Sequence, residues 1–137
     1  MTSISLAQYR EEILKLSCQP KPTKRNKFNA SKVECDGMTF DSKKEYKRYI
    51  ELKAMQQRGE ITGLQHHTKF ELAPKTKLEG ENRAKPALRY FADFTYYNTL
   101  GEYVVEDVKS AATRKKDSYR NKKHLMKTVL NIDVREV

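Results

Sequence analysis

The chain has 137 residues, with 28 Lys and Arg against 18 Asp and Glu, which gives a formal net charge of +10. This length predicts one principal domain, and a hydrophobic content of 37% leaves it a small core. Neither a membrane-length apolar run nor the basic start and apolar run of a secretory signal is present, so we predict a cytoplasmic protein with no membrane contact. The strong positive charge favours a polyanionic partner, nucleic acid above all.

The N-terminal segment predicts a helix followed by a linker. Residues 4–17 place apolar side chains at helical spacing (Leu6, Tyr9, Ile13 and Leu16), and Ser5 with Gln8 fits a capping box. Residues 19–29 form a basic, proline-containing stretch that we expect to stay extended or disordered until it meets a partner. We therefore divide the chain into an N-terminal helix and linker, 1–29, and a main domain, 30–137. The linker cations Lys24, Arg25 and Lys27 are candidate DNA contacts.

A hairpin and a core helix are predicted next. Asp36-Gly37 is a strong two-residue turn signal within residues 31–40, and residues 43–58 have a broad apolar face that ends at Gly59. Glu45 lies in the first turn of this helix and has two interpretations. It completes a capping box with Ser42, or it is an acidic member of a functional site. Cys18 and Cys35 are too few for a disulfide framework or a zinc site, and we expect two free thiols.

The middle of the chain carries weaker signals. Residues 70–72 predict a short strand, and the lysine-rich loop 74–86 is either a clamp over substrate or a solvated connection. His66 and His67 are adjacent, so on an extended segment they should point to opposite faces and not bind one ion together.

Residues 89–109 carry the most informative pattern, a predicted hairpin with its turn at 98–102. If Tyr97 pairs with Tyr103, the register places Asp93 opposite Asp107, and two like charges facing each other destabilise a ladder. Lys109 shares a strand face with Asp107. Carboxylates and a lysine among aromatic and branched residues indicate a cation site, the outline of a metal-dependent nuclease. Glu106 should lie on the opposite face in a surface ion pair.

The last third is basic and should form a helix and a final strand. Asp117 or Ser118 can cap a helix with Tyr119, Leu125, Met126 and Val129 inward, and residues 132–137 alternate as a strand. The cationic run is either a solvated helix face or a phosphate-binding surface, and its position directly after the Asp-x-Lys strand favours the second. The candidate DNA-binding residues here are Arg114, Lys115, Lys116, Arg120, Lys122 and Lys123.

The order of an acidic residue on a helix, an Asp on a strand and Asp-x-Lys on the next strand resembles the PD-(D/E)XK nuclease superfamily. More narrowly, the segments VECDGMTFDSKKEYKRYIE, FADFTYY and VVEDVKS resemble a family of small phage and prophage proteins of unassigned function within it. The resemblance implies an α+β, restriction-endonuclease-like fold with a helix-strand-strand-strand-helix-strand core, here preceded by the N-terminal helix and hairpin. It implies Glu45, Asp93, Asp107 and Lys109 as catalytic residues, and a phage-encoded protein would act in the bacterial host's cytoplasm.

The chemistry that follows is phosphodiester hydrolysis with a hard divalent cation. Asp93 and Asp107 would hold Mg²⁺, for which Mn²⁺ would substitute, with Glu45 as a further ligand. Lys109 would orient or help deprotonate the attacking water and offset charge on the phosphate.

We therefore predict a metal-dependent DNA endonuclease, with branched recombination intermediates as substrates in the manner of Holliday-junction resolvases. The alternative is a non-catalytic, basic DNA-binding accessory protein of a phage or mobile element. A homodimer formed through the N-terminal helix would supply two active sites for cutting two strands.

Overall fold

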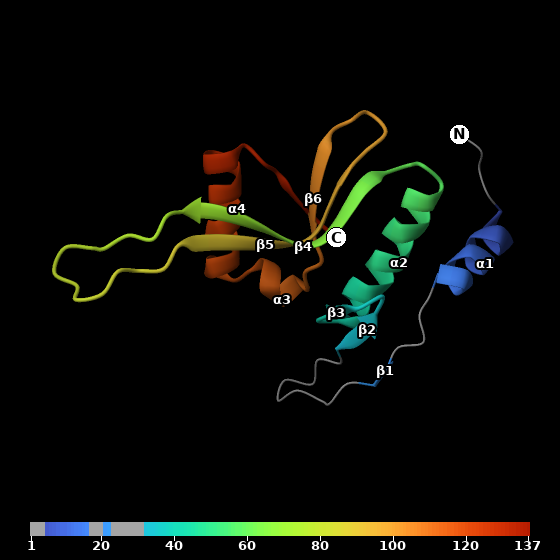
Figure 1. Cartoon of the computed structure of the whole chain (residues 1–137), viewed down its shortest axis with the longest axis horizontal. Coiled ribbons are helices and arrows are strands. Elements are labelled where there is room, and N and C mark those ends of the chain that lie inside the picture. The colour runs from blue at the N-terminus through green and yellow to red at the C-terminus, as the bar shows by residue number, and fades with distance from the viewer. Residues whose placement is uncertain (1–4, 17–20, 23–31) are drawn as a thin grey trace. The chain divides into compact units, whose positions relative to one another are not determined.

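The computed structural model describes residues 5–16, 21–22 and 32–137, and the chain divides into two compact units, Met1–Leu64 and Gln65–Val137 (Figure 1). The predicted boundary between residues 29 and 30 lies outside the described residues. Each unit has secondary structure of its own.

The first unit combines two helices with a small sheet. Its elements are α1 (Leu6–Leu16), β1 (Lys21–Pro22), β2 (Val33–Cys35), β3 (Met38–Phe40) and α2 (Lys43–Gln57). The three strands are antiparallel in the order β1-β2-β3. Asp36 and Gly37 join β2 to β3 with φ values of 51° and 74°, so both turn residues are left-handed, as a tight two-residue hairpin turn requires. The predicted hairpin is confirmed.

Helix α2 packs its apolar face as the sequence indicates. Tyr49, Ile50 and Leu52 are buried, and the ring of Phe40 from β3 packs against that of Tyr49. The helix ends at Gln57 with Arg58 as its C-cap, and the next residue, Gly59, has a φ of 77°, the left-handed conformation that favours glycine there.

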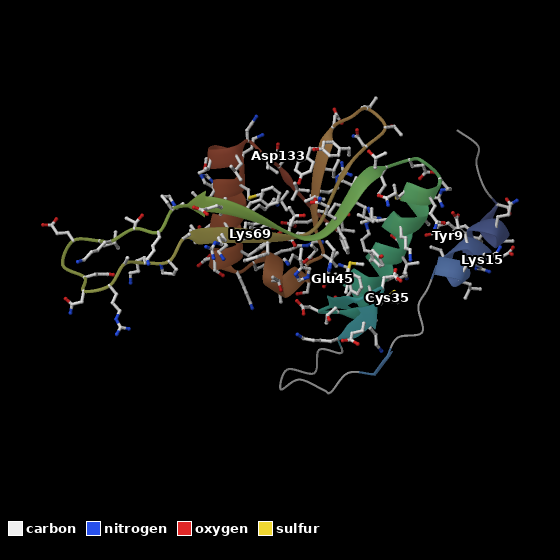
Figure 2. All side chains as sticks on the ribbon, in the orientation of Figure 1. Tyr9, Lys15, Cys35, Glu45, Lys69 and Asp133 are labelled. Carbon is white, nitrogen blue, oxygen red and sulfur yellow. The ribbon has the colours of Figure 1, made fainter. Side chains whose placement is uncertain are left out.

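Helix α1 is capped as predicted and contacts α2. Ser5 and Gln8 exchange hydrogen bonds of 2.9 and 3.2 Å, and Glu12 on α1 pairs with Arg58 at 2.9 Å. Leu6, which the helical spacing places on the apolar stripe, is 66% exposed on the first turn of the helix. The prediction of two free thiols is wrong, since Cys35 is in a disulfide. Figure 2 labels Cys35, and Cys18 lies outside the described residues.

The second unit is built on a four-stranded mixed sheet. Strand β4 (Thr62–Ala73) enters it from the first unit, and β5 (Leu88–Tyr97), β6 (Tyr103–Asp107), α3 (Ala111–Arg114), α4 (Asp117–Leu130) and β7 (Val134–Glu136) follow. The sheet order is β4-β5-β6-β7, with β6 antiparallel to β5 and parallel to β7. The fold is therefore α+β, and the succession α2, β4, β5, β6, α4, β7 follows the predicted helix-strand-strand-strand-helix-strand order.

One side of this sheet and α4 enclose the core of the second unit. The buried cluster comprises Leu72, Tyr90, Ala92, Val105, Tyr119, Met126 and Val134. Tyr119 and Met126 are inward as predicted, but Val129 is more than half exposed near the C-terminal end of α4. Neither Asp117 nor Ser118 caps α4, whose N-cap is Lys116 without a side-chain hydrogen bond.

Strand β4 is longer than predicted, covering twelve residues where the sequence indicated three. Its inward positions include His66 and Thr68, and polar residues there hide the alternation that marks a strand. The rings of His66 and His67 lie 4.0 Å apart and His67 has a φ of 56°, so the expectation of opposite faces is wrong because the backbone departs from strand geometry.

Residues 74–87 continue β4 and β5 as a projecting hairpin (Figure 1). Thr76 and Lys85 exchange backbone hydrogen bonds of 3.1 and 2.7 Å across it. The segment therefore has defined pairing, and its role as clamp or connection stays a prediction. None of the helices in the described part of the chain has the length and apolar content to cross a bilayer.

Candidate active site

The β5–β6 hairpin brings the three predicted residues together. Tyr97 pairs with Tyr103 and Phe94 with Glu106, as expected, and Asp93 and Asp107 each lie one residue beyond this paired stretch. The Lys109 ammonium lies 3.1 Å from Asp107 Oδ1 and 3.7 Å from Asp93 Oδ2. Two carboxylates and one lysine thus converge at the end of the hairpin.

Asp93 is held by the backbone of the segment that follows β6. The Val108 N–H donates to Asp93 Oδ2 at 2.8 Å. Strict alternation would put Ala92 and Val105 on opposite faces, yet both belong to the core cluster covered by α4. The alternation of β5 therefore shifts by one residue near Asp93, which is the effect of a β-bulge. This shift lets Tyr90 approach Asp107.

Asp107 is buried with one oxygen unsatisfied. Its side chain is 1% exposed, and Oδ2 accepts a hydrogen bond from the Tyr90 hydroxyl. Oδ1 has no hydrogen-bond partner among the described residues, because the Lys109 ammonium approaches at ion-pair distance but outside hydrogen-bond geometry. Buried carboxylate oxygens are normally satisfied, and an exception is explained by strain, function or a bound ion. The donor set therefore fits a cation.

Two tyrosines lie beside Asp107, and no sequence motif marked either of them as a site residue. Burial, followed by the hydrogen bond to Asp107, raises the pKa of Tyr90 far above its usual range. Burial and the negative charges of Asp107 and Glu136 likewise raise the pKa of Tyr119. Both hydroxyls therefore remain protonated donors near neutral pH, fixing carboxylates by hydrogen bonds without neutralising them.

Glu136 is a further carboxylate beside the site, and no sequence pattern predicted a role for it. It is the parallel-ladder partner of Asp107. It accepts hydrogen bonds from Lys123 Nζ at 2.7 Å and the Tyr119 hydroxyl at 3.2 Å. The Lys123 hydrogen bond is the main cause that lowers the pKa of Glu136. Only the parallel pairing of β6 with β7 reveals this neighbour.

Asp107 lines a cavity of about 290 Å³ whose walls are partly cationic. Its lining includes Tyr90, Phe91, Asp107, Lys109, Lys116 and Lys122. Lys116 and Lys122, predicted to bind DNA, thus lie beside the proposed catalytic residues. Of the other predicted DNA contacts, Arg114, Arg120 and Lys123 line a second cavity, Lys115 is exposed, and Lys24, Arg25 and Lys27 lie outside the described residues.

Residues 25–135 match the family described as "Protein of unknown function (DUF1064)", a span that contains the acidic and basic residues of the site. The chain belongs to the DUF1064 family. No curated protein and no solved structure matches it.

Glu45 of this DUF1064 protein lies in the first turn of α2 (Figure 2) and has the structural role that the sequence offered. The Ser42 hydroxyl accepts from the Glu45 N–H at 3.1 Å, while Glu45 Oε2 accepts from the Asp41 N–H at 3.0 Å. The reciprocal bond thus goes to the residue before the cap. Glu45 is 3% exposed and belongs to the first unit, and its role as a metal ligand stays a prediction.

Glu106 of the DUF1064 chain corrects a prediction. We expected a surface ion pair, but the side chain is fully buried and accepts a hydrogen bond of 2.5 Å from the Tyr96 hydroxyl. The prediction assumed a hairpin with one face in solvent, so that Glu106, on the face opposite Asp107, would be exposed. Residues 104–107 are all buried instead, so β6 is covered on both faces.

Proposed function

We propose that the protein is a metal-dependent deoxyribonuclease that hydrolyses phosphodiester bonds within DNA. The observation that carries the proposal is the convergence of Asp93, Asp107 and Lys109 around a buried, unsatisfied carboxylate oxygen at a cationic cavity. On this view the chain is a member of the PD-(D/E)XK superfamily with a restriction-endonuclease-like fold, encoded by a phage or mobile element and acting in the bacterial cytoplasm.

Charge balance supports a cation at this site. Asp93 and Asp107 carry two negative charges and Lys109 one positive charge, which leaves −1 in a largely buried place. Uncompensated buried charge is costly. Asp93 and Asp107 would hold Mg²⁺, which favours a few carboxylates and retains waters, and Mn²⁺ would substitute. When bound, such an ion supplies a Lewis acid for a phosphoryl oxygen and lowers the pKa of water.

The protein side chains have separable roles in this proposal. Tyr90 donates to Asp107 Oδ2 and so leaves Oδ1 available to a ligand. Lys109, paired with two carboxylates, is suited to donating hydrogen bonds, so it orients the attacking water and offsets the charge that develops on the phosphate.

The DNA would be held by charge beside this site. Lys116 and Lys122 line the same cavity as Asp107, and the chain carries a net charge of +10. Contacts of lysine with phosphates fix the position of a strand without reading its sequence. This arrangement suits substrates recognised by structure, and branched recombination intermediates are the first to examine.

A second candidate function is that of a non-catalytic DNA-binding accessory protein. It is favoured by one observation, namely that Lys109 already pairs with both carboxylates and so neutralises part of their charge. In this case the same cations would bind DNA without turnover.

The deciding experiment incubates the full chain with linear, single-stranded, flapped and four-way-junction DNAs in Mg²⁺, Mn²⁺ or EDTA. Asp107→Asn is the test variant, and Glu102→Gln, an exposed carboxylate in the turn of the same hairpin, is the matched control. Cleavage that requires metal and Asp107 but tolerates Glu102→Gln supports the nuclease. Binding without cleavage of any substrate supports the accessory protein.

A further inference from the structure

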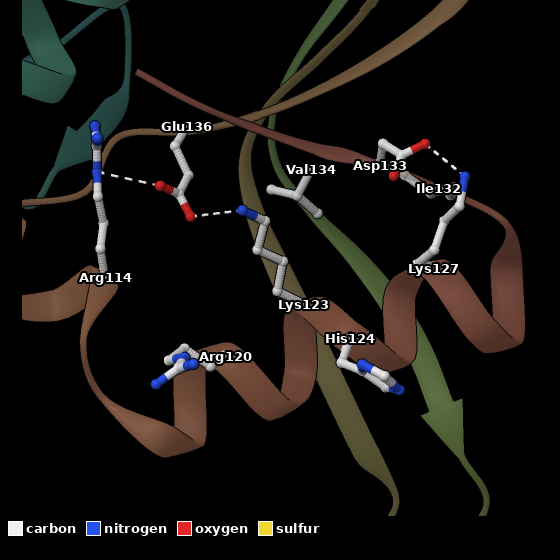
Figure 3. A pocket seen from close by; sticks show the side chains of 9 residues that line it. All are labelled: Arg114, Arg120, Lys123, His124, Lys127, Ile132, Asp133, Val134 and Glu136. Carbon is white, nitrogen blue, oxygen red and sulfur yellow. Dashed lines mark hydrogen bonds and ion pairs between the residues drawn. The ribbon is translucent and has the colours of Figure 1, made fainter.

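A second cavity, of about 480 Å³, lies between α4 and β7 (Figure 3). Its charged lining consists of Arg114, Arg120, Lys123, Lys127, Asp133 and Glu136. Four cations against two carboxylates leave a charge of +2 there. A concave surface with surplus positive charge attracts an anion and focuses the field on it.

The cations of α4 are arranged as a row. Arg120, Lys123 and Lys127 are separated by three and four residues, which puts them on one side of a helix, and Figure 3 shows them along the cavity. Lys127 pairs with Asp133 at 2.6 Å, whereas Arg120 has no ion-pair partner in the described part of the chain. Arg120 therefore retains its donors for a ligand.

Glu136 shows that the inner end of this cavity already accommodates an oxyanion. Its carboxylate receives Lys123 Nζ at 2.7 Å on one oxygen and lies 3.3 Å from Arg114 Nε on the other. These donors come from different elements and converge on a single acid. A phosphate offers more acceptor oxygens than a carboxylate and matches the arginine fork, so it would bind the same donors together with Arg120.

We propose that the α4–β7 cavity is a phosphate-binding site in which Glu136 occupies Arg114 and Lys123 until a phosphate of a nucleic-acid strand displaces it. The inference rests on the proposed function only for the identity of the ligand as nucleic acid. Glu136 is the ladder partner of Asp107, on strands that lie about 4.8 Å apart in such a sheet. The α4–β7 cavity would thus hold one phosphate of a nucleic-acid strand, while a nearby phosphate of the same nucleic-acid strand lies at the carboxylate site.

The test is fluorescence anisotropy of labelled duplex DNA with the full chain in EDTA, where no metal-dependent cleavage interferes. Glu136→Gln should bind about threefold tighter, because it releases two cations from an internal ion pair. Arg120→Gln should bind about tenfold more weakly, the ratio for one charge-assisted hydrogen bond. Arg120→Gln should also reduce the slope of log affinity against log salt by about 0.9.

Two controls carry the same changes in net charge outside the cavity. Asp117→Asn removes a carboxylate from the first turn of α4, and Arg135→Gln removes a cation from the exposed side of β7. Equal effects of Glu136→Gln and Asp117→Asn, or of Arg120→Gln and Arg135→Gln, would overturn the inference. The melting temperature of each variant identifies any loss of folding.

Competition between pyrophosphate and DNA for the wild-type chain is a second test. It remains valid even if Glu136→Gln does not fold. Pyrophosphate should displace DNA from wild type more effectively than from Arg120→Gln. If pyrophosphate binding depends on Arg120 but DNA binding does not, the cavity binds free phosphates. That result would overturn nucleic acid as the ligand. Failure of the nuclease proposal would instead appear as absent cleavage in Mg²⁺, with these binding differences intact.

Discussion

Two neighbouring carboxylates on β6 are both buried, yet they have opposite surroundings. Glu106 is enclosed and receives the Tyr96 hydroxyl at 2.5 Å. Asp107, one residue later, is equally buried but lines a cavity, pairs with Lys109, and keeps one oxygen without a hydrogen bond. The comparison shows that burial of an acid does not by itself mark a site. An unsatisfied oxygen that a ligand can reach is the distinguishing property.

Loss of activity should separate the two acids most strongly. Asp107→Asn retains the shape of the side chain and an acceptor for Tyr90 but removes the charge, so cleavage in Mg²⁺ should fall to background, as should that of Lys109→Ala. DNA affinity in EDTA should change little, because binding rests on the distributed cations. Single-turnover cleavage and anisotropy measure the two quantities.

Glu106→Gln is the control for this loss, and it should retain cleavage at temperatures where it is folded. Equal cutting by wild type, Asp107→Asn and Lys109→Ala would contradict the assignment of the site, whatever the effect on DNA binding.

The free energy of unfolding should depend on Glu106 more than on Asp107, the reverse of their order for activity. Glu106→Gln replaces an enclosed acceptor with an amide whose NH₂ needs a partner, so the free energy of unfolding should fall by about 1–3 kcal/mol. Asp107→Asn should leave the metal-free protein as stable as wild type or more stable, because it relieves repulsion with Asp93. Urea unfolding in EDTA compares them. A larger stability loss in Asp107→Asn would make Asp107 the structural acid.

The same comparison shows how far the sequence could lead. The register of β5 with β6 between Phe94 and Tyr97 was predictable, because a turn at residues 98–102 and alternating side chains determine which residues face each other. It brought Asp107 and the end of β5 near Asp93 together, although the shift of alternation at Asp93 was not predicted. Glu136 was not predicted either, because its place beside Asp107 depends on parallel pairing across a helical crossover. The surface position predicted for Glu106 was wrong, because the alternation of side chains shows which face of the strand a residue is on but not whether that face is buried.

Divalent metal should stabilise the protein through the carboxylates of Asp93 and Asp107. A ligand that binds only the folded chain raises stability by about 2.7 kcal/mol at a hundredfold excess over its Kd. Mg²⁺ or Mn²⁺ should therefore raise the melting temperature of wild type and of Glu102→Gln but not of Asp93→Asn. A metal-free Asp93→Asn protein markedly less stable than wild type would instead identify Asp93 as a structural acceptor for the Val108 N–H.

Replacement of Glu45, a third buried acid, should have the smallest effect on stability and cleavage. The comparison of Glu106 with Asp107 does not decide whether Glu45 serves the fold or the metal site. Its Oε2 accepts from the Asp41 N–H, as an enclosed acid would, and Glu45→Gln preserves an oxygen there, so stability should fall by no more than about 1 kcal/mol. If Glu45 is also a metal ligand, the variant should lower the metal-induced rise in melting temperature and slow cleavage, since an amide is a weaker ligand than a carboxylate for Mg²⁺. Calorimetric titration with Mn²⁺ and single-turnover cleavage measure both effects. Unchanged metal affinity and cleavage would place Glu45 with Glu106, as an acid whose hydrogen bonds serve the fold alone.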